Sequence, residues 1–121
     1  MTDVGDFPKD AVSGITPDEW EHLASHFEVG RDIMPHVLGA SIGIEYRPAR
    51  ALLLALGMFG LAENYLYVYH VCTEAPLKAR KLSEGFEPLP WTCPYCEQSV
   101  VSRSELRYDL VCRPTVAIRF V

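Results

Sequence analysis

Three cysteines and one histidine in the second half of the chain have the types and spacing of metal ligands. Cys93 and Cys96 are separated by two residues, so two thiolates can hold one metal ion from a single tight turn. His70 and Cys72 form a second pair, because residues two apart on a strand point to the same side. Zinc takes four such ligands in structural sites. The sequence therefore predicts a structural zinc ion bound by His70, Cys72, Cys93 and Cys96.

Cys112 is an alternative ligand for the same metal. It shares one face of a predicted strand with Leu106, Tyr108 and Leu110, so its other interpretation is a small buried core residue. Four protein ligands leave no open position for a reacting water, which predicts a stabilising and not a catalytic metal. The chain also has no phosphate-binding glycine loop and no nucleophile elbow. We therefore expect no enzymatic activity.

The stretch Cys93-Pro-Tyr-Cys96 is also similar to the active-site sequence of glutaredoxins. That resemblance implies thiol–disulfide exchange as an alternative function. In glutaredoxins the first cysteine follows a strand and begins a helix, which lowers its pKa. Here the sequence before Cys93 is rich in turn residues, and only 25 residues follow Cys96. In Arg113-Pro-Thr-Val116 the proline stands before the Thr-Val and not after it, so it does not match the loop that presents a cis-proline in that family.

Two groups of basic residues are candidates for contact with nucleic acid. The first lies at the start of a predicted helix and the second in a long loop: Arg47 and Arg50, and Lys78, Arg80 and Lys81. The net charge is −5, and residues 1–50 hold nine acidic and four basic side chains. The chain thus lacks the basic surface that phosphate binding requires, and the helix has almost no polar face to read base edges. A small DNA-binding transcriptional regulator is therefore an alternative that we do not favour.

Predicted helices and strands position these residues. Thr16-Pro-Asp-Glu19 has the composition of a capping box, which predicts a helix over 17–29. Asp32 can cap a short helix over 33–38, and the Leu-rich segment 48–62 predicts a third, largely buried helix. Strands are expected over residues 65–72, 105–112 and 116–121.

The stretch from Arg50 to Glu63, which ends in Gly-Leu-Ala-Glu, is followed by Tyr65-Leu-Tyr-Val-Tyr69. Together they resemble the third helix and first wing strand of the winged-helix superfamily, and the resemblance covers residues 16–72. It implies an α+β fold with a three-helix, winged-helix-like N-terminal part, followed by a small antiparallel sheet with a zinc knuckle. A winged helix followed by a zinc ribbon is similar to some subunits of the transcription machinery.

Three parts of the chain are expected: a flexible tail over 1–14, a winged-helix-like part over 15–72, and a zinc-knuckle and strand part over 73–121 that packs on it. The longest apolar run, Ala51 to Ala62, has twelve residues. A membrane span needs about 20, so we expect no membrane segment. An acidic start after Met1 and the suitability of the cysteines for metal binding predict a cytoplasmic protein.

The favoured function is that of a non-catalytic, zinc-stabilised protein–protein adaptor or regulatory subunit whose partner is another protein. The last strand offers one candidate contact surface. Val116, Ile118 and Phe120 alternate with other residues, which is typical of an inner strand that completes the core. The alternative is an edge strand at which a partner or a second copy of the chain docks, giving a homodimer.

Overall fold

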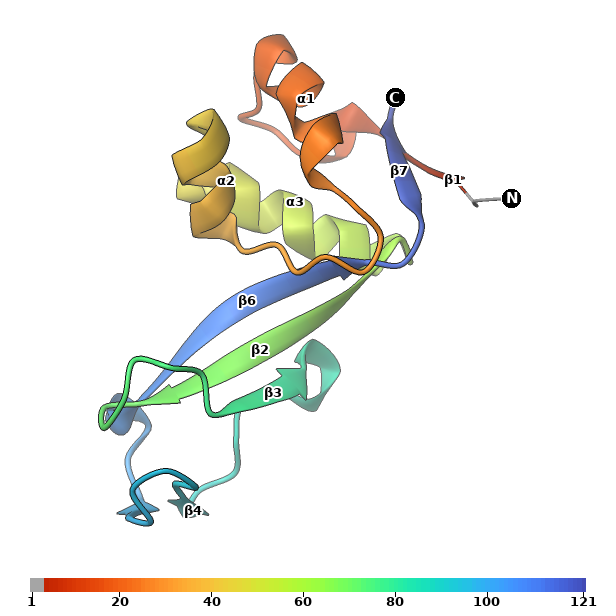
Figure 1. The fold of residues 1–121 in the computed structure, drawn as a ribbon. Coiled ribbons are helices and arrows are strands. Elements are labelled where there is room, and N and C mark those ends of the chain that lie inside the picture. The colour runs from red at the N-terminus through yellow and green to blue at the C-terminus, as the bar shows by residue number, and fades with distance from the viewer. Residues whose placement is uncertain (1–3) are drawn as a thin grey trace. The chain divides into compact units, whose positions relative to one another are not determined.

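The computed structural model describes residues 4–121, and these residues combine three α-helices with several strands (Figure 1). The prediction of an α+β fold is therefore confirmed. The chain divides into two compact units. The first consists of residues up to Asn64 together with Val111–Val121, and the second of Tyr65–Leu110. Within the described residues, no helix has the length and apolar content needed to cross a membrane.

The first helix, α1 (Pro17–Leu23), begins as the sequence predicts. The Thr16 backbone N–H donates to the Glu19 carboxylate at 2.8 Å, and the Glu19 N–H donates to the Thr16 hydroxyl at 3.2 Å. This reciprocal capping box satisfies two N–H groups that a helix start otherwise leaves unpaired. The helix is shorter than the predicted 17–29, because residues Ala24–His26 tighten into a 3₁₀ turn.

The other two helices are each displaced from their predicted ranges. α2 (Pro35–Ile42) begins at a proline, whose fixed φ suits the first helical position, and ends at Gly43 with φ of 84°. α3 (Tyr46–Met58) ends before the predicted residue 62. Its buried side chains share one side of the helix and are Ala49, Leu52, Leu53 and Leu56.

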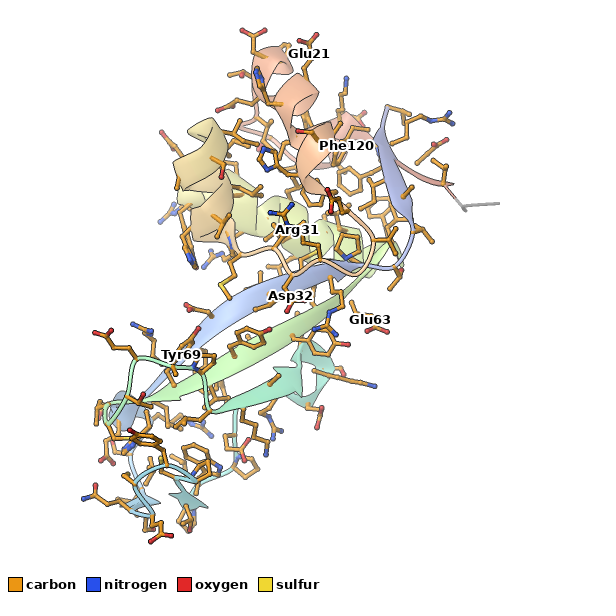
Figure 2. The ribbon with its side chains drawn as sticks, viewed as in Figure 1. Glu21, Arg31, Asp32, Glu63, Tyr69 and Phe120 are labelled. Atoms are coloured by element: carbon orange, nitrogen blue, oxygen red, sulfur yellow. The ribbon has the colours of Figure 1, made fainter. Side chains whose placement is uncertain are left out.

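A parallel pair of strands joins the two ends of the described chain, β1 (Val4–Phe7) and β7 (Ala117–Phe120). Phe7 is fully buried, and its ring lies 5.9 Å from that of Phe120. The ring of Phe120, which is labelled in Figure 2, also lies 5.1 Å from that of Trp20 of α1. Residues 4–7, which the sequence assigns to a flexible tail, form a strand of which Phe7 is buried; residues 1–3 lie outside the described residues.

Strand β2 (Ala62–His70) is the central strand of a three-stranded sheet, between β3 (Lys78–Lys81) and β6 (Leu106–Pro114). β2 and β3 are antiparallel, with Leu66 opposite Arg80. β3 lies in a segment that the sequence predicts to be irregular. β4 (Trp91–Thr92) and β5 (Ser99–Val100) form a separate antiparallel hairpin.

The second unit has a small apolar core of its own between this hairpin and the sheet. Its buried members and the side chains packed against them are Val68, Val100, Leu106, Leu89, Trp91 and Tyr108. The division of the structure differs from the expected boundary between residues 72 and 73. The chain enters the second unit along β2 and leaves it along β6, so residues 111–121 return to the unit that holds the helices.

Candidate metal centre

The end of β2 positions the first two candidate ligands. Side chains alternate along a strand, and the side chains of Leu66, Val68 and His70 are all buried. His70 is only 2% exposed. Cys72 follows in a turn that is closed by a hydrogen bond from the Thr73 N–H to the His70 carbonyl oxygen at 3.2 Å. The strand and its terminal turn thus hold the imidazole and the thiol close together.

The turn between β4 and β5 positions the other two ligands. The Cys93 N–H donates to the Gln98 carbonyl at 3.0 Å, and the Glu97 N–H donates to the Cys93 carbonyl at 2.9 Å. Glu97 has φ of 62°, a left-handed conformation that is uncommon for residues other than glycine. This conformation lets the chain reverse directly after Cys96, so that both thiols face the inside of the turn.

The four side chains meet around one point. One donor atom from each of His70, Cys72, Cys93 and Cys96 lies within 4.8 Å of every other. The Cys72 and Cys93 Sγ atoms are 3.6 Å apart, and the Cys96 Sγ lies 3.5 Å from the His70 Nδ1. The residues predicted from the sequence therefore lie together, in an arrangement compatible with a metal site.

The surroundings of the thiols favour ionisation of one of them. Burial opposes the charged form of Cys93, but N–H groups of Cys96 and Tyr95 and the neighbouring thiols outweigh it and lower the pKa of Cys93 to about 7. Desolvation and the thiols of Cys93 and Cys96 instead raise the pKa of Cys72 to about 12. Three clustered thiols cannot all ionise cheaply unless a cation compensates their charge.

The imidazole of His70 presents its Nδ1 to this cluster. Its other nitrogen, Nε2, is buried and has no hydrogen-bond partner among the residues that the structure describes. In neutral imidazole one nitrogen carries the proton and the other accepts or binds a metal. A proton on Nε2 therefore leaves the Nδ1 lone pair free toward the cluster, where the Cys96 Sγ lies 3.5 Å away.

Cys112 is not one of the four clustered residues. It lies on β6 within the first unit, where its N–H and carbonyl both bond to the backbone of Ile33 at 2.8 Å. The thiol is fully buried, and burial, with the nearby charge of Asp32, raises the pKa of Cys112 to about 12. These features are those of a neutral core residue.

Two of the predicted nucleic-acid contacts are engaged elsewhere. Lys78 Nζ and an Arg80 guanidinium N–H donate to the carboxylate of Glu87, at 2.9 Å and 2.6 Å. Glu87 is buried. Its role could not be read from the sequence, because a lone glutamate in a turn-rich segment carries no local signal of burial or pairing. Lys81 is exposed on β3, and Arg47 and Arg50 are exposed at the start of α3.

Comparisons with protein-family models, with curated proteins and with solved structures give no match. Function must therefore be inferred from the residues and their geometry.

Proposed function

We propose that this protein is a non-catalytic adaptor or regulatory subunit whose second unit is stabilised by one structural zinc ion. The observation that carries the proposal is the convergence of His70, Cys72, Cys93 and Cys96 on one point. The four residues come from two turns that are more than 20 residues apart in the sequence. One ion bound by all four would cross-link those turns.

The spacing of the donor atoms supports zinc as the ion. In a tetrahedral site with Zn–S bonds of about 2.3 Å and Zn–N bonds of about 2.0 Å, sulfur atoms lie about 3.8 Å apart and sulfur and nitrogen about 3.5 Å apart. The sulfur–sulfur distance between Cys72 and Cys93 is 3.6 Å, and the sulfur–nitrogen distance between Cys96 and His70 is 3.5 Å. Three thiolates and one imidazole also form a common donor set for structural zinc.

A saturated ligand set supports a structural role, because four protein ligands leave no place for substrate or a reactive water. The order of three helices followed by the long strand β2 supports the winged-helix resemblance of residues 16–72. In the first unit, an antiparallel bridge between Ile33, which precedes α2, and Cys112 of β6 also connects the helical segment to the end of this strand.

The two alternatives have less support. For the DNA-binding regulator, Arg47 and Arg50 are exposed, but Lys78 and Arg80 already neutralise Glu87. For the thiol–disulfide enzyme, a helix should begin at the first cysteine. Instead, Cys93 lies in the turn of a β-hairpin.

Metal content and its consequence for folding test the proposal. The purified protein should contain about one zinc ion per chain, and a strong chelator should unfold residues 65–110, because structural zinc supplies folding free energy. The double variant Cys93→Ser/Cys96→Ser should bind no zinc and should aggregate. A native protein that is fully folded without metal would exclude this function.

A further inference from the structure

The outer face of α3 is defined here as Arg47, Arg50, Ala51, Leu54 and Met58, which follow one another at helical spacing. The opposite side of the helix is buried in the first unit. Met58 is 86% exposed, the largest exposed fraction among the large apolar side chains of the described residues. Leu54 is half-buried, so the outer face of α3 is partly apolar and its apolar end is turned to solvent mainly at Met58.

The two arginines of this face are unlike the other arginines of their unit. The others each pair with a carboxylate: Arg31 with Glu28, Arg113 with Asp32 and Arg119 with Asp6. Within residues 4–121, Arg47 and Arg50 have no such partner, and α3 itself contains no acidic residue. The Arg50 guanidinium lies instead over the ring of Tyr46, 5.7 Å from its centre. Two uncompensated positive charges thus stand side by side on one helix.

The position of these charges does not serve the helix. A cation near a helix N-terminus is opposed by the helix dipole, at about 0.3–1 kcal/mol for each charge. Arg47 and Arg50 lie in the first two turns of α3, whereas Leu54 and Met58 lie near its end. At a rise of about 1.5 Å per residue, Arg47 and Met58 are about 16 Å apart along the axis. The face is therefore positive at one end and apolar at the other.

We propose that the outer face of α3 binds an acidic amphipathic helix of a partner protein. Carboxylates of the partner meet Arg47 and Arg50, and its apolar side chains cover Leu54 and Met58. Phe59, which is 51% exposed directly after the helix, extends the apolar end. This inference rests on the adaptor function proposed above, but α3 holds no candidate metal ligand, so the two can fail separately.

Charge complementarity decides between this partner and duplex DNA. The chain has a net charge of −5, so its long-range field repels a polyanion such as duplex DNA. Two arginines neutralise too few phosphates to hold a duplex at physiological salt, where affinity depends on many such contacts. A short acidic helix needs only the local positive end of the face, together with an apolar surface to cover.

The test uses the zinc-loaded full chain and a fluorescein-labelled synthetic helix of about 20 residues, long enough to form helix in isolation. The peptide carries glutamates on its first two turns and leucines at i, i+3, i+4 and i+7 on its last turns. Anisotropy should show saturable binding of one peptide per chain. Met58→Glu, and the double variant Arg47→Glu/Arg50→Glu, should each weaken binding about tenfold or more. A second peptide with lysines in place of the glutamates should bind the double variant better than it binds the native protein.

Two variants control for negative charge added outside α3, and Val29→Glu changes the net charge by the same amount as Met58→Glu. Lys9→Glu and Val29→Glu alter exposed residues of the same unit outside α3 and should leave the affinity within about twofold of native. Circular dichroism should show that all variants are folded. The proposal fails if no saturable binding occurs, if the control variants weaken binding equally, or if the lysine peptide fails to rescue. If duplex DNA binds at physiological salt through the same arginines, the proposal is overturned and the outer face of α3 is a nucleic-acid-binding surface.

Discussion

Neighbouring thiols in the candidate metal centre differ in how readily they ionise. N–H groups aimed at its sulfur lower the pKa of Cys93 to about 7, whereas Cys72, desolvated beside two other thiols, has its pKa raised to about 12. A metal binds thiolates, so the proton of Cys72 must leave when the ion arrives. A bound zinc ion would therefore supply the charge compensation that the protein alone does not provide.

Cys112 is expected not to bind the metal. Cys112→Ala should keep about one zinc ion per chain and should lower the free energy of unfolding by about 1 kcal/mol, the usual effect of a small loss of packing. His70→Ala or Cys72→Ser should release the zinc, because each removes one of four ligands. Metal analysis and denaturant unfolding of the three variants measure both effects. Zinc loss from Cys112→Ala would reassign the ligands.

Glu87 is a second residue on which we expect the stability of the second unit to depend. Its carboxylate is buried beside Lys78 and Arg80. Burial raises the pKa of Glu87, but the hydrogen bonds and charges of the two cations outweigh this effect and lower it. A carboxyl group with a lowered folded-state pKa stabilises the fold above its unfolded pKa of about 4.3, and that contribution is lost as pH falls through the folded value.

Glu87→Gln should therefore destabilise the protein by about 2–3 kcal/mol at neutral pH, since it leaves two cations without their charged partner. The difference from the native protein should shrink as pH falls through the folded-state pKa of Glu87, which lies below the ordinary value for a glutamate, because the native carboxylate is then protonated too. Denaturant unfolding at several pH values, with equal zinc content, measures it. Glu74→Gln, a change at an exposed carboxylate of the same unit, should have an effect below about 0.5 kcal/mol at every pH.

The candidate ligands could be predicted from the sequence because their arrangement is local. Two residues separate Cys93 from Cys96, and only one residue separates His70 from Cys72. The expected strand alternation does not place Cys72, because β2 ends at His70 and a turn carries Cys72 to the same site. The role of Glu87 could not be predicted, because it arises only when a turn-rich segment folds back on β3. The signal for a buried ion pair lies in the tertiary contact and not in the spacing of residues.

The helices and strands also divide into those that depend on neighbouring residues, which are predictable, and those that depend on distant partners, which are not. The start of α1 was predictable, because the capping box involves only neighbours in the sequence. β1 was not, since Val-Gly-Asp-Phe has little strand character and its partner lies about 110 residues away at Ala117–Phe120. β3, Lys-Ala-Arg-Lys, likewise lacks apolar alternation and exists because β2 offers an edge.

Strand β7 is expected to be part of the core. Phe120 contacts the rings of Phe7 in β1, of Trp20 in α1 and of Phe27, which directly follows the 3₁₀ turn. Phe120→Ala should lower the free energy of unfolding by about 3 kcal/mol, and deletion of residues 117–121 should unfold the first unit. Circular dichroism and thermal unfolding measure these effects. A truncated chain that stays folded but changes its assembly state would instead support docking at this strand.

The whole chain is arranged as one unit inserted into another. Residues 65–110 interrupt the first unit, which is completed only when Val111–Val121 returns beside the helices. The sequence could not reveal this division, because β2 and β6 each run without a break from one unit into the other. A boundary that falls inside a strand has no glycine, proline or change of composition to mark it.

We expect this insertion to tie the stability of the first unit to the zinc ion proposed for the second unit. When the second unit is disordered, folding of the first unit must close a loop of about 46 residues. When the second unit is folded, its two ends are held together and act as a loop of only a few residues. The long loop costs about 2 kcal/mol more in closure entropy than the short one. Chelation should therefore lower the unfolding free energy of the first unit by about that amount. In a Trp91→Phe variant, Trp20 is the only tryptophan and reports on this unit alone. If the unfolding curve from Trp20 fluorescence is the same with and without chelator, the two units fold independently. If chelation instead lowers the stability reported by Trp20, zinc stabilises the first unit as a distant cross-link would, by restricting the unfolded chain.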